Sequence, residues 1–244
     1  MSALLINANA LNIPLADKSV QCVVTSPPYY GLRNYGVDGQ LGLEPTPDEY
    51  VANMVAVFRE CKRVLKDDGT LWLNIGDSYA SMKSRYNQKA QNLNGGKAQD
   101  NEFQGNKTDL YHHPELGLKD KDLIGIPWML AFALRADGWW LRQDIIWAKP
   151  NPMPESVKDR CTKSHEYIFL LSKSAKYYYD NEAVKEQSKE PEDNRGERGN
   201  RKRFPTDKIA GIRGPGIYPM ANKRDVWTVT TKPYKGAHYA TFPP

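Results

Sequence analysis

Cysteine is scarce in this chain. Only three of its 244 residues are cysteines, namely Cys22, Cys61 and Cys161, and no two of them have CxxC spacing. An odd number of scattered cysteines argues against a disulfide framework and against a cysteine-rich zinc site. We therefore expect a protein of the reducing cytoplasm with no structural metal.

Long apolar runs are lacking as well. The longest, residues 126–134, is about half the length that a membrane span needs, and Arg135 and Asp137 close it. The N-terminus shows no basic region followed by an apolar stretch, so it does not resemble a secretory signal. The sequence predicts a soluble protein with no membrane partner.

The remaining composition is that of a globular protein. With 40% hydrophobic residues, the chain can bury the core of one domain plus an insertion. Its 34 Lys and Arg residues exceed its 29 Asp and Glu residues. Such an excess favours an anionic partner if it is clustered, although proteins that bind no nucleic acid share this balance.

Apolar periodicity predicts an alternation of strands and helices. Strand-like runs occupy residues 4–6, 20–25, 70–75, 139–147 and 165–171, and helical patterns occupy 48–65 and 127–136. Thr46 and Pro47 form an N-cap and first turn, and residues 66–69 should end the first helix. The last two strands should form an antiparallel hairpin. Ser26 and Gly76-Asp77 should lie at one sheet edge, where open α/β sheets bind ligands.

Two polar segments interrupt this pattern. Residues 78–121 are rich in Asn, Gln, Gly and Lys and predict a long loop or small insertion. Residues 185–213 pass from acidic to basic, and the basic half includes Arg201, Lys202 and Arg203. A charge run of this kind is more often a solvated loop than a binding surface, but its basic half is a candidate for phosphate contacts.

The run Thr25-Ser26-Pro27-Pro28-Tyr29-Tyr30-Gly31 follows the strand-like residues 20–24 directly. Proline fixes φ and restricts the residue before it, so the backbone should be extended with outward carbonyls. A polar oxygen and an aromatic face at one point suit a flipped-out nucleobase with an exocyclic amino group. Stacking is worth roughly 1–3 kcal/mol per base, comparable with the cost of unstacking. A simple Pro-Pro turn that ends a strand is the alternative.

This run resembles the catalytic motif of DNA amino-methyltransferases, and its Ser26 is more typical of N4-cytosine than of N6-adenine enzymes. Residues 4–9, 65–77, 138–150, 164–169 and 238–243 resemble further motifs of that family in order. The resemblance implies a Rossmann-like, S-adenosylmethionine-dependent α/β methyltransferase fold with inserted target-recognition segments. It is similar to the permuted class, in which the catalytic half precedes the cofactor half and which phages and restriction-modification systems often encode.

The resemblance also implies a domain order and a set of site residues. Residues 1–77 would be the catalytic half, 78–121 an insertion, 122–179 the helix and hairpin, 180–224 the target-recognition segment and 225–244 the start of the cofactor-side motif. The implied catalytic residues are Ser26, Pro27, Pro28 and Tyr29. The implied cofactor-binding residues are Asn9, Thr25, His238 and Phe242. The implied substrate-binding residues are Tyr30, Lys149, Asn151, Arg201, Lys202 and Arg203.

Two departures from the family pattern stand out. The glycine-rich loop that holds S-adenosylmethionine should follow Pro244, where this sequence stops, and Asn9 replaces a common Asp. The fold would then be incomplete, with a gap between the strands at 4–6 and 20–25. The interpretations are a truncated gene, a second chain that completes the domain, or a rearranged fold.

The function expected is transfer of a methyl group to the exocyclic amino group of a flipped base in double-stranded DNA, cytosine N4 before adenine N6. One alternative is a DNA-binding half that is inactive without a second chain, and another is methylation of RNA or of a protein amide. The sequence has no Pro-Cys pair for C5-methylation, no deaminase zinc motif and no phosphate-binding GxxxxGK[ST] loop.

Overall fold

The computed structural model describes residues 3–80, 117–189, 192–193 and 216–231. The chain divides into two compact units. One contains the residues up to Tyr178 and those from Val226 onward, and the other is Tyr179–Asp225. Residues 81–116 of the predicted insertion at 78–121 lie outside the described residues, as do Arg201, Lys202, Arg203, His238 and Phe242.

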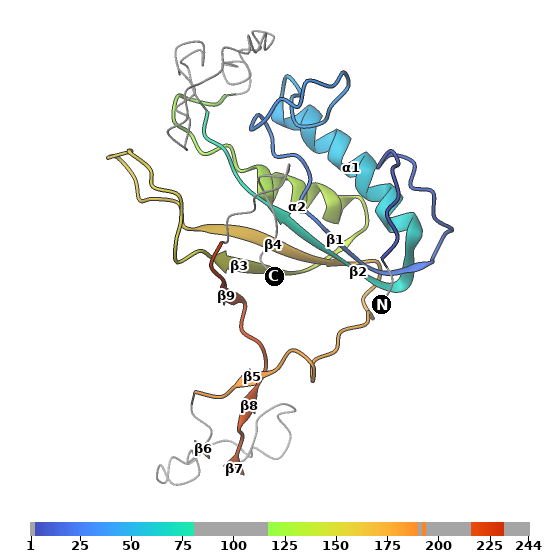
Figure 1. Cartoon of the computed structure of the whole chain (residues 1–244), viewed down its shortest axis with the longest axis vertical. Helices are drawn as coiled ribbons and strands as arrows, with labels where there is room; N and C mark the ends of the chain where they lie inside the picture. The colour runs from blue at the N-terminus through green and yellow to red at the C-terminus, as the bar shows by residue number, and fades with distance from the viewer. Residues whose placement is uncertain (1–2, 81–116, 190–191, 194–215, 232–244) are drawn as a thin grey trace. The chain divides into compact units, whose positions relative to one another are not determined.

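The larger unit is built on a mixed five-stranded sheet (Figure 1). Its strands in spatial order are β1 (Val20–Thr25), β2 (Leu65–Ile75), β4 (His165–Ser172), β3 (Trp140–Ala148) and β9 (Val226–Thr228). β1 runs parallel to β2 and β9 parallel to β3, while β4 runs antiparallel to both of its neighbours. The parallel pair and the antiparallel hairpin predicted from the sequence are therefore confirmed.

Helix α1 (Pro47–Val64) begins where the capping pattern predicts. The Thr46 Oγ1 atom accepts a hydrogen bond from the Glu49 backbone N–H at 3.1 Å, which satisfies one donor of the open first turn. Pro47 occupies the first turn, where its missing N–H is not needed. The cap therefore fixes where the helix starts, and its apolar residues then face the sheet.

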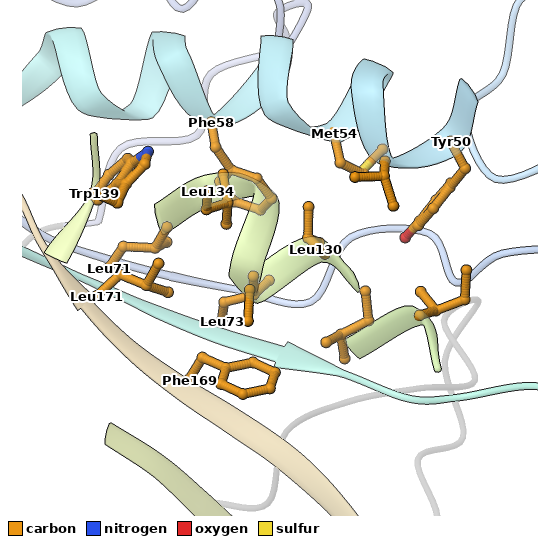
Figure 2. Packing of buried hydrophobic residues seen from close by; sticks show 14 of the residues in the cluster. Tyr50, Met54, Phe58, Leu71, Leu73, Leu130, Leu134, Trp139, Phe169 and Leu171 are labelled. Carbon is orange, nitrogen blue, oxygen red and sulfur yellow. The ribbon is translucent and has the colours of Figure 1, made fainter. Parts of the chain in front are cut away.

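The hydrophobic core lies between the helices and one face of the sheet (Figure 2). Figure 2 shows side chains of α1 and α2 (Ile126–Ala136) pointing toward those of β2 and β4. The labelled residues are Tyr50, Met54, Phe58, Leu71, Leu73, Leu130, Leu134, Trp139, Phe169 and Leu171. Burial of such a side chain stabilises the fold by about 1.5–3 kcal/mol, so this layer holds β2 and β4 in place.

Asp77 links the end of β2 to the start of α2. Its carboxylate accepts hydrogen bonds from the backbone N–H groups of Gly125 and Ile126, with Asp77 Oδ1 at 3.0 Å from both nitrogens. An acidic side chain at a helix N-terminus satisfies open donors and favours the helix dipole. The helix ends at Ala136, and Gly138 follows with a φ of 87°, a backbone conformation that glycine adopts easily.

Two sequence predictions about strands are corrected, and one strand was not predicted. Leu4–Ile6 forms no strand, and Leu4 and Leu5 are 81% and 95% exposed. A strand needs a hydrogen-bonded neighbour, and β1 forms the edge of the described sheet. Residues 66–69 are not a separate turn, because β2 starts at Leu65 and its register with β1 shifts. β9 was not predicted because it has only three residues.

The unit Tyr179–Asp225 contains two short antiparallel pairs. β5 (Glu186–Gln187) pairs with β8 (Met220–Ala221), and β6 (Glu192–Asp193) pairs with β7 (Gly216–Ile217). Its role in target recognition stays a prediction. None of the helices in the described part of the chain is both long and apolar enough to span a membrane.

The Thr46 cap gives a first test of this fold. Thr46→Ala should lower the free energy of unfolding by about 1 kcal/mol, because the Glu49 N–H loses its acceptor. Thr46→Ser is the matched control and should stay near the wild-type value, since serine also caps. Urea denaturation measures both. Equal stability of the alanine and serine variants would contradict the role of the cap.

Candidate functional site

The Ser-Pro-Pro-Tyr run follows β1 at the edge where β1 and β2 both end. Thr25 is paired with Leu73, so the loop that begins at Ser26 leaves the sheet beside the last residues of β2. Ser26 is exposed, whereas Tyr29 is half-buried. The predicted meeting of the two strand ends at one edge is confirmed.

Gly76 makes room for the ring of Tyr29. A Cβ atom on Gly76 would lie 2.6 Å from Cε2 of Tyr29, which is closer than atoms in real structures approach. The missing side chain lets the ring lie against the backbone just after β2. This close approach directs the Tyr29 hydroxyl toward the polar residues of β2 and β4.

Two hydrogen bonds fix the backbone of the Ser-Pro-Pro-Tyr loop, one from the first turn of α1 and one to the segment before it. The Tyr50 hydroxyl donates a hydrogen bond to the Pro28 carbonyl at 2.9 Å, and the Gly31 N–H donates to the Gly42 carbonyl at 2.7 Å. Tyr30 is only 1% exposed, and its ring lies 5.5 Å from that of Tyr50, centroid to centroid. Tyr30 was expected to line the substrate pocket. It belongs to the core instead, because the loop turns its side chain toward α1.

Four polar side chains from four segments converge behind Ser26. The Tyr29 hydroxyl lies 2.8 Å from Glu166 Oε2, 3.1 Å from Asn74 Oδ1 and 3.3 Å from Ser26 Oγ. Asn74 Nδ2 donates to Glu166 Oε2 at 3.1 Å, and the Lys149 ammonium is ion-paired with Glu166 Oε1. We call Tyr29, Asn74, Lys149 and Glu166 the strand-end cluster.

The neighbours of Glu166 in this cluster stabilise its negative charge. Burial by itself would raise the pKa of Glu166, but hydrogen bonding and charge from Lys149, with bonds from Tyr29 and Asn74, hold that pKa below its ordinary value. Burial and the nearby Glu166 charge raise the pKa of the Tyr29 hydroxyl. Glu166 is therefore a carboxylate and Tyr29 a neutral phenol at neutral pH.

Lys163 is a second cation near this cluster. Its ammonium donates to the Asp77 carbonyl at 3.3 Å. Burial lowers its pKa, while the charges of Asp77 and Glu166 oppose that shift. Two lysines of the segment between β3 and β4, Lys149 and Lys163, therefore lie close enough to Glu166 to interact with its charge.

The other predicted site residues are less directly involved. Asn9 is exposed, and its Oδ1 accepts from the Leu11 N–H at 2.9 Å, so its oxygen is used in a local turn. Thr25 ends β1 beside Ser26. The Asn151 amide pairs with the backbone of Thr231, its Nδ2 and Oδ1 each 3.0 Å from their partners. Asn151 thus fastens the loop after β3 to the chain after β9.

Sequence reasoning missed Asn74, Glu166 and Lys163. Asn74 and Glu166 carried a detectable signal, because each is a polar residue within a strand that is otherwise largely apolar. Such residues have to find partners in the folded state. Lys163 carried no comparable signal. No group of three or more potential metal ligands occurs in the part of the chain that the structure describes.

A mixed α/β sheet with this loop at its strand ends is a methyltransferase fold. The solved PvuII DNA methyltransferase, described as cytosine-N4-specific, matches it with a TM-score of 0.52 and 13% sequence identity. That match covers 94% of this chain and 58% of the PvuII chain.

The sequence relatives define the family. Residues 20–244 match the DNA methylase family N6_N4_Mtase, and the chain belongs to it. The Type II methyltransferase M.Cfr9I of Citrobacter freundii is 48% identical over 99% of this chain and 69% of its own length. M.SmaI of Serratia marcescens is 49% identical over 94% of this chain and 66% of its own length. The chain thus spans about two-thirds of the length of these relatives.

The contact between Gly76 and Tyr29 yields a second prediction. Gly76→Ala should lower the free energy of unfolding by about 1–3 kcal/mol, because the new Cβ displaces the Tyr29 ring. In a Tyr29→Ala background the same change should have a much smaller effect, since the crowding atoms are gone. A double-mutant cycle by urea denaturation measures the difference. An equal loss in both backgrounds would show that the ring does not lie against Gly76.

Proposed function

We propose that this chain forms the catalytic part of a DNA amino-methyltransferase that methylates the exocyclic amino group of a flipped base, cytosine N4 in preference to adenine N6. The observation that carries the proposal is the exposed Ser26 hydroxyl at the end of β1, directly in front of the strand-end cluster. Family membership supports DNA as the substrate, and Ser26 supports cytosine, because the family resemblance associates serine at this position with N4 enzymes.

The chemistry requires an acceptor at this point. An exocyclic amino nitrogen is a poor nucleophile because its lone pair is delocalised into the ring. Hydrogen bonds accepted from its two N–H groups by Ser26 Oγ and the Pro27 carbonyl favour a pyramidal nitrogen with a localised lone pair. Acceptors already in position stabilise the transition state without reorganisation.

The hydrogen bonding of the loop supports Ser26 and Pro27, rather than Pro28, as the acceptors for the substrate. The Pro28 carbonyl already accepts from Tyr50, whereas the Pro27 carbonyl has no donor within the described part of the chain. Pro27 and Ser26 are thus available to a substrate, and Pro28 holds the loop. The Tyr29 ring would stack on the flipped base, with its hydroxyl fixed by the strand-end cluster.

S-adenosylmethionine is the methyl donor used by this family, and it would supply an electrophilic methyl group to the amino nitrogen. Of the residues proposed to bind it, Thr25 and Asn9 are described, and the Asn9 oxygen is engaged in its own turn. Their arrangement does not by itself make a cofactor site. His238 and Phe242 remain the other proposed contacts.

A second candidate function is that of a catalytic half that needs a further polypeptide segment, in the same chain or in another. β1 is the edge of the described sheet, and Val24 on it is 63% exposed. An unpaired strand edge with exposed apolar side chains suits the addition of further strands. Double-stranded DNA remains the proposed substrate, and Arg201, Lys202 and Arg203 remain proposed phosphate contacts.

Cofactor titration separates the two candidates. Calorimetric titration of the 244-residue chain with S-adenosylmethionine should give micromolar binding if the cofactor site is formed. Incubation with DNA and mass spectrometry of the released nucleosides should then detect N4-methylcytosine. N6-methyladenine instead would contradict the base preference. Absence of cofactor binding would favour the half that needs a further segment.

Substitutions in the loop test the catalytic roles. Ser26→Ala should reduce methyl transfer by at least a hundredfold, about 2.7 kcal/mol or more in activation free energy, while leaving DNA affinity near the wild-type value. Tyr29→Ala should reduce both the rate of methyl transfer and the affinity for DNA, because the stacking surface is lost. Steady-state kinetics and a DNA-binding titration measure these effects. Full activity of Tyr29→Ala would exclude base stacking by this ring.

A further inference from the structure

The orientation of the Asn74 side chain is fixed by its surroundings. Its Nδ2 lies 3.0 Å from the Tyr167 carbonyl and 3.1 Å from Glu166 Oε2. A carbonyl and a carboxylate can only accept hydrogen bonds, so both must face the amide NH₂ group. Asn74 Oδ1 is therefore the atom that faces the Tyr29 hydroxyl.

The Tyr29 hydroxyl consequently meets two acceptors. Asn74 Oδ1 and Glu166 Oε2 lie 3.1 Å and 2.8 Å from it, and neither carries a proton to donate. The single phenolic proton must point toward this pair. The remaining side of the Tyr29 oxygen, which faces Ser26, can then only accept.

Ser26 is therefore left with one arrangement of its proton. Its Oγ lies 3.3 Å from the Tyr29 oxygen and donates its hydrogen to it. Within the described part of the chain, no group donates a hydrogen bond to Ser26 Oγ, and the residue is exposed. The lone pairs of Ser26 are turned outward, toward the position where a substrate would lie.

We propose that Glu166 is a positioning residue that, through Tyr29, directs the Ser26 proton inward and makes Ser26 Oγ an obligatory acceptor for the amino group of the substrate. The inference rests on the proposed function and adds to it a role for a residue outside the Ser-Pro-Pro-Tyr motif. Asn74 supports the same direction from β2.

The direction of this hydrogen-bond chain matters for the reaction. If Ser26 could rotate and donate its proton outward, it would bond to the amino lone pair and hold the electrons that must attack the methyl group. A Ser26 that can only accept leaves this lone pair free. The ion pair with Lys149 keeps Glu166 ionised, so that Glu166 itself has no proton to donate.

The test uses Tyr29→Phe, Glu166→Gln and their double variant in the 244-residue chain. Phenylalanine keeps the stacking ring but removes the oxygen, and glutamine keeps the shape of Glu166 but brings an N–H group that can donate. Each single variant should reduce kcat about tenfold with little change in KM for DNA. The double variant should also lose about tenfold, because both act through one hydrogen-bond chain.

Glu60→Gln on α1 and Tyr178→Phe in the exposed segment after β4 are the matched controls and should retain the wild-type kcat. A wild-type kcat in Tyr29→Phe or Glu166→Gln would overturn the inference. A roughly hundredfold loss in the double variant would also overturn it, because the two residues would then act independently.

Failure of the proposed function has a different signature. If the wild-type protein transfers no methyl group, the same variants are compared in a double-mutant cycle on the free energy of unfolding, measured by urea denaturation. A coupling between positions 29 and 166 of about threefold or more in the unfolding equilibrium constant would support the hydrogen-bond chain even then. Additive effects would overturn it.

Discussion

A carboxylate withdrawn from water has to find partners, and the arrangement of this site follows from how Glu166 finds them. Its side chain is 19% exposed, and it is held by the Lys149 ammonium, the Tyr29 hydroxyl and the Asn74 amide. Removing one partner of a buried ion pair costs about 3–5 kcal/mol. The cluster therefore ties the Ser-Pro-Pro-Tyr loop, β2, the end of β3 and β4 to one point.

The sheet topology makes this convergence possible. Parallel pairing of β1 and β2 brings Ser26 and Asn74 to the same edge, and antiparallel pairing of β4 with β2 returns Glu166 to that edge. The helices on the opposite side of β2 bury its apolar residues (Figure 2). Alternation along β2 thus assigns Leu73 to the core and its neighbour Asn74 to the polar side.

The site combines rigid support with an exposed acceptor. Tyr50 holds Pro28 and the core holds Tyr30, so the loop backbone is fixed by α1 and by the core. Ser26 is exposed, whereas no residue of the strand-end cluster behind it is. In the proposed reaction, this division would let the amino group of the substrate meet acceptors that do not have to move. In the proposed role, Glu166 adds to this by fixing the direction of the Ser26 proton through Tyr29.

The sequence by itself determined β1, the capped helix α1, helix α2 and the hairpin of β3 and β4, because local periodicity, caps and turn residues encode them. It also located the Ser-Pro-Pro-Tyr loop at a strand end. It misplaced Leu4–Ile6, since a strand depends on a neighbour, and it put Tyr30 in the pocket. Only the tertiary structure brought Asn74, Lys149 and Glu166 to Tyr29. The predicted hairpin places Lys149 near Glu166, but Asn74 meets Glu166 only because β2 pairs with β4. No local pattern in the sequence specifies which strands of distant segments pair.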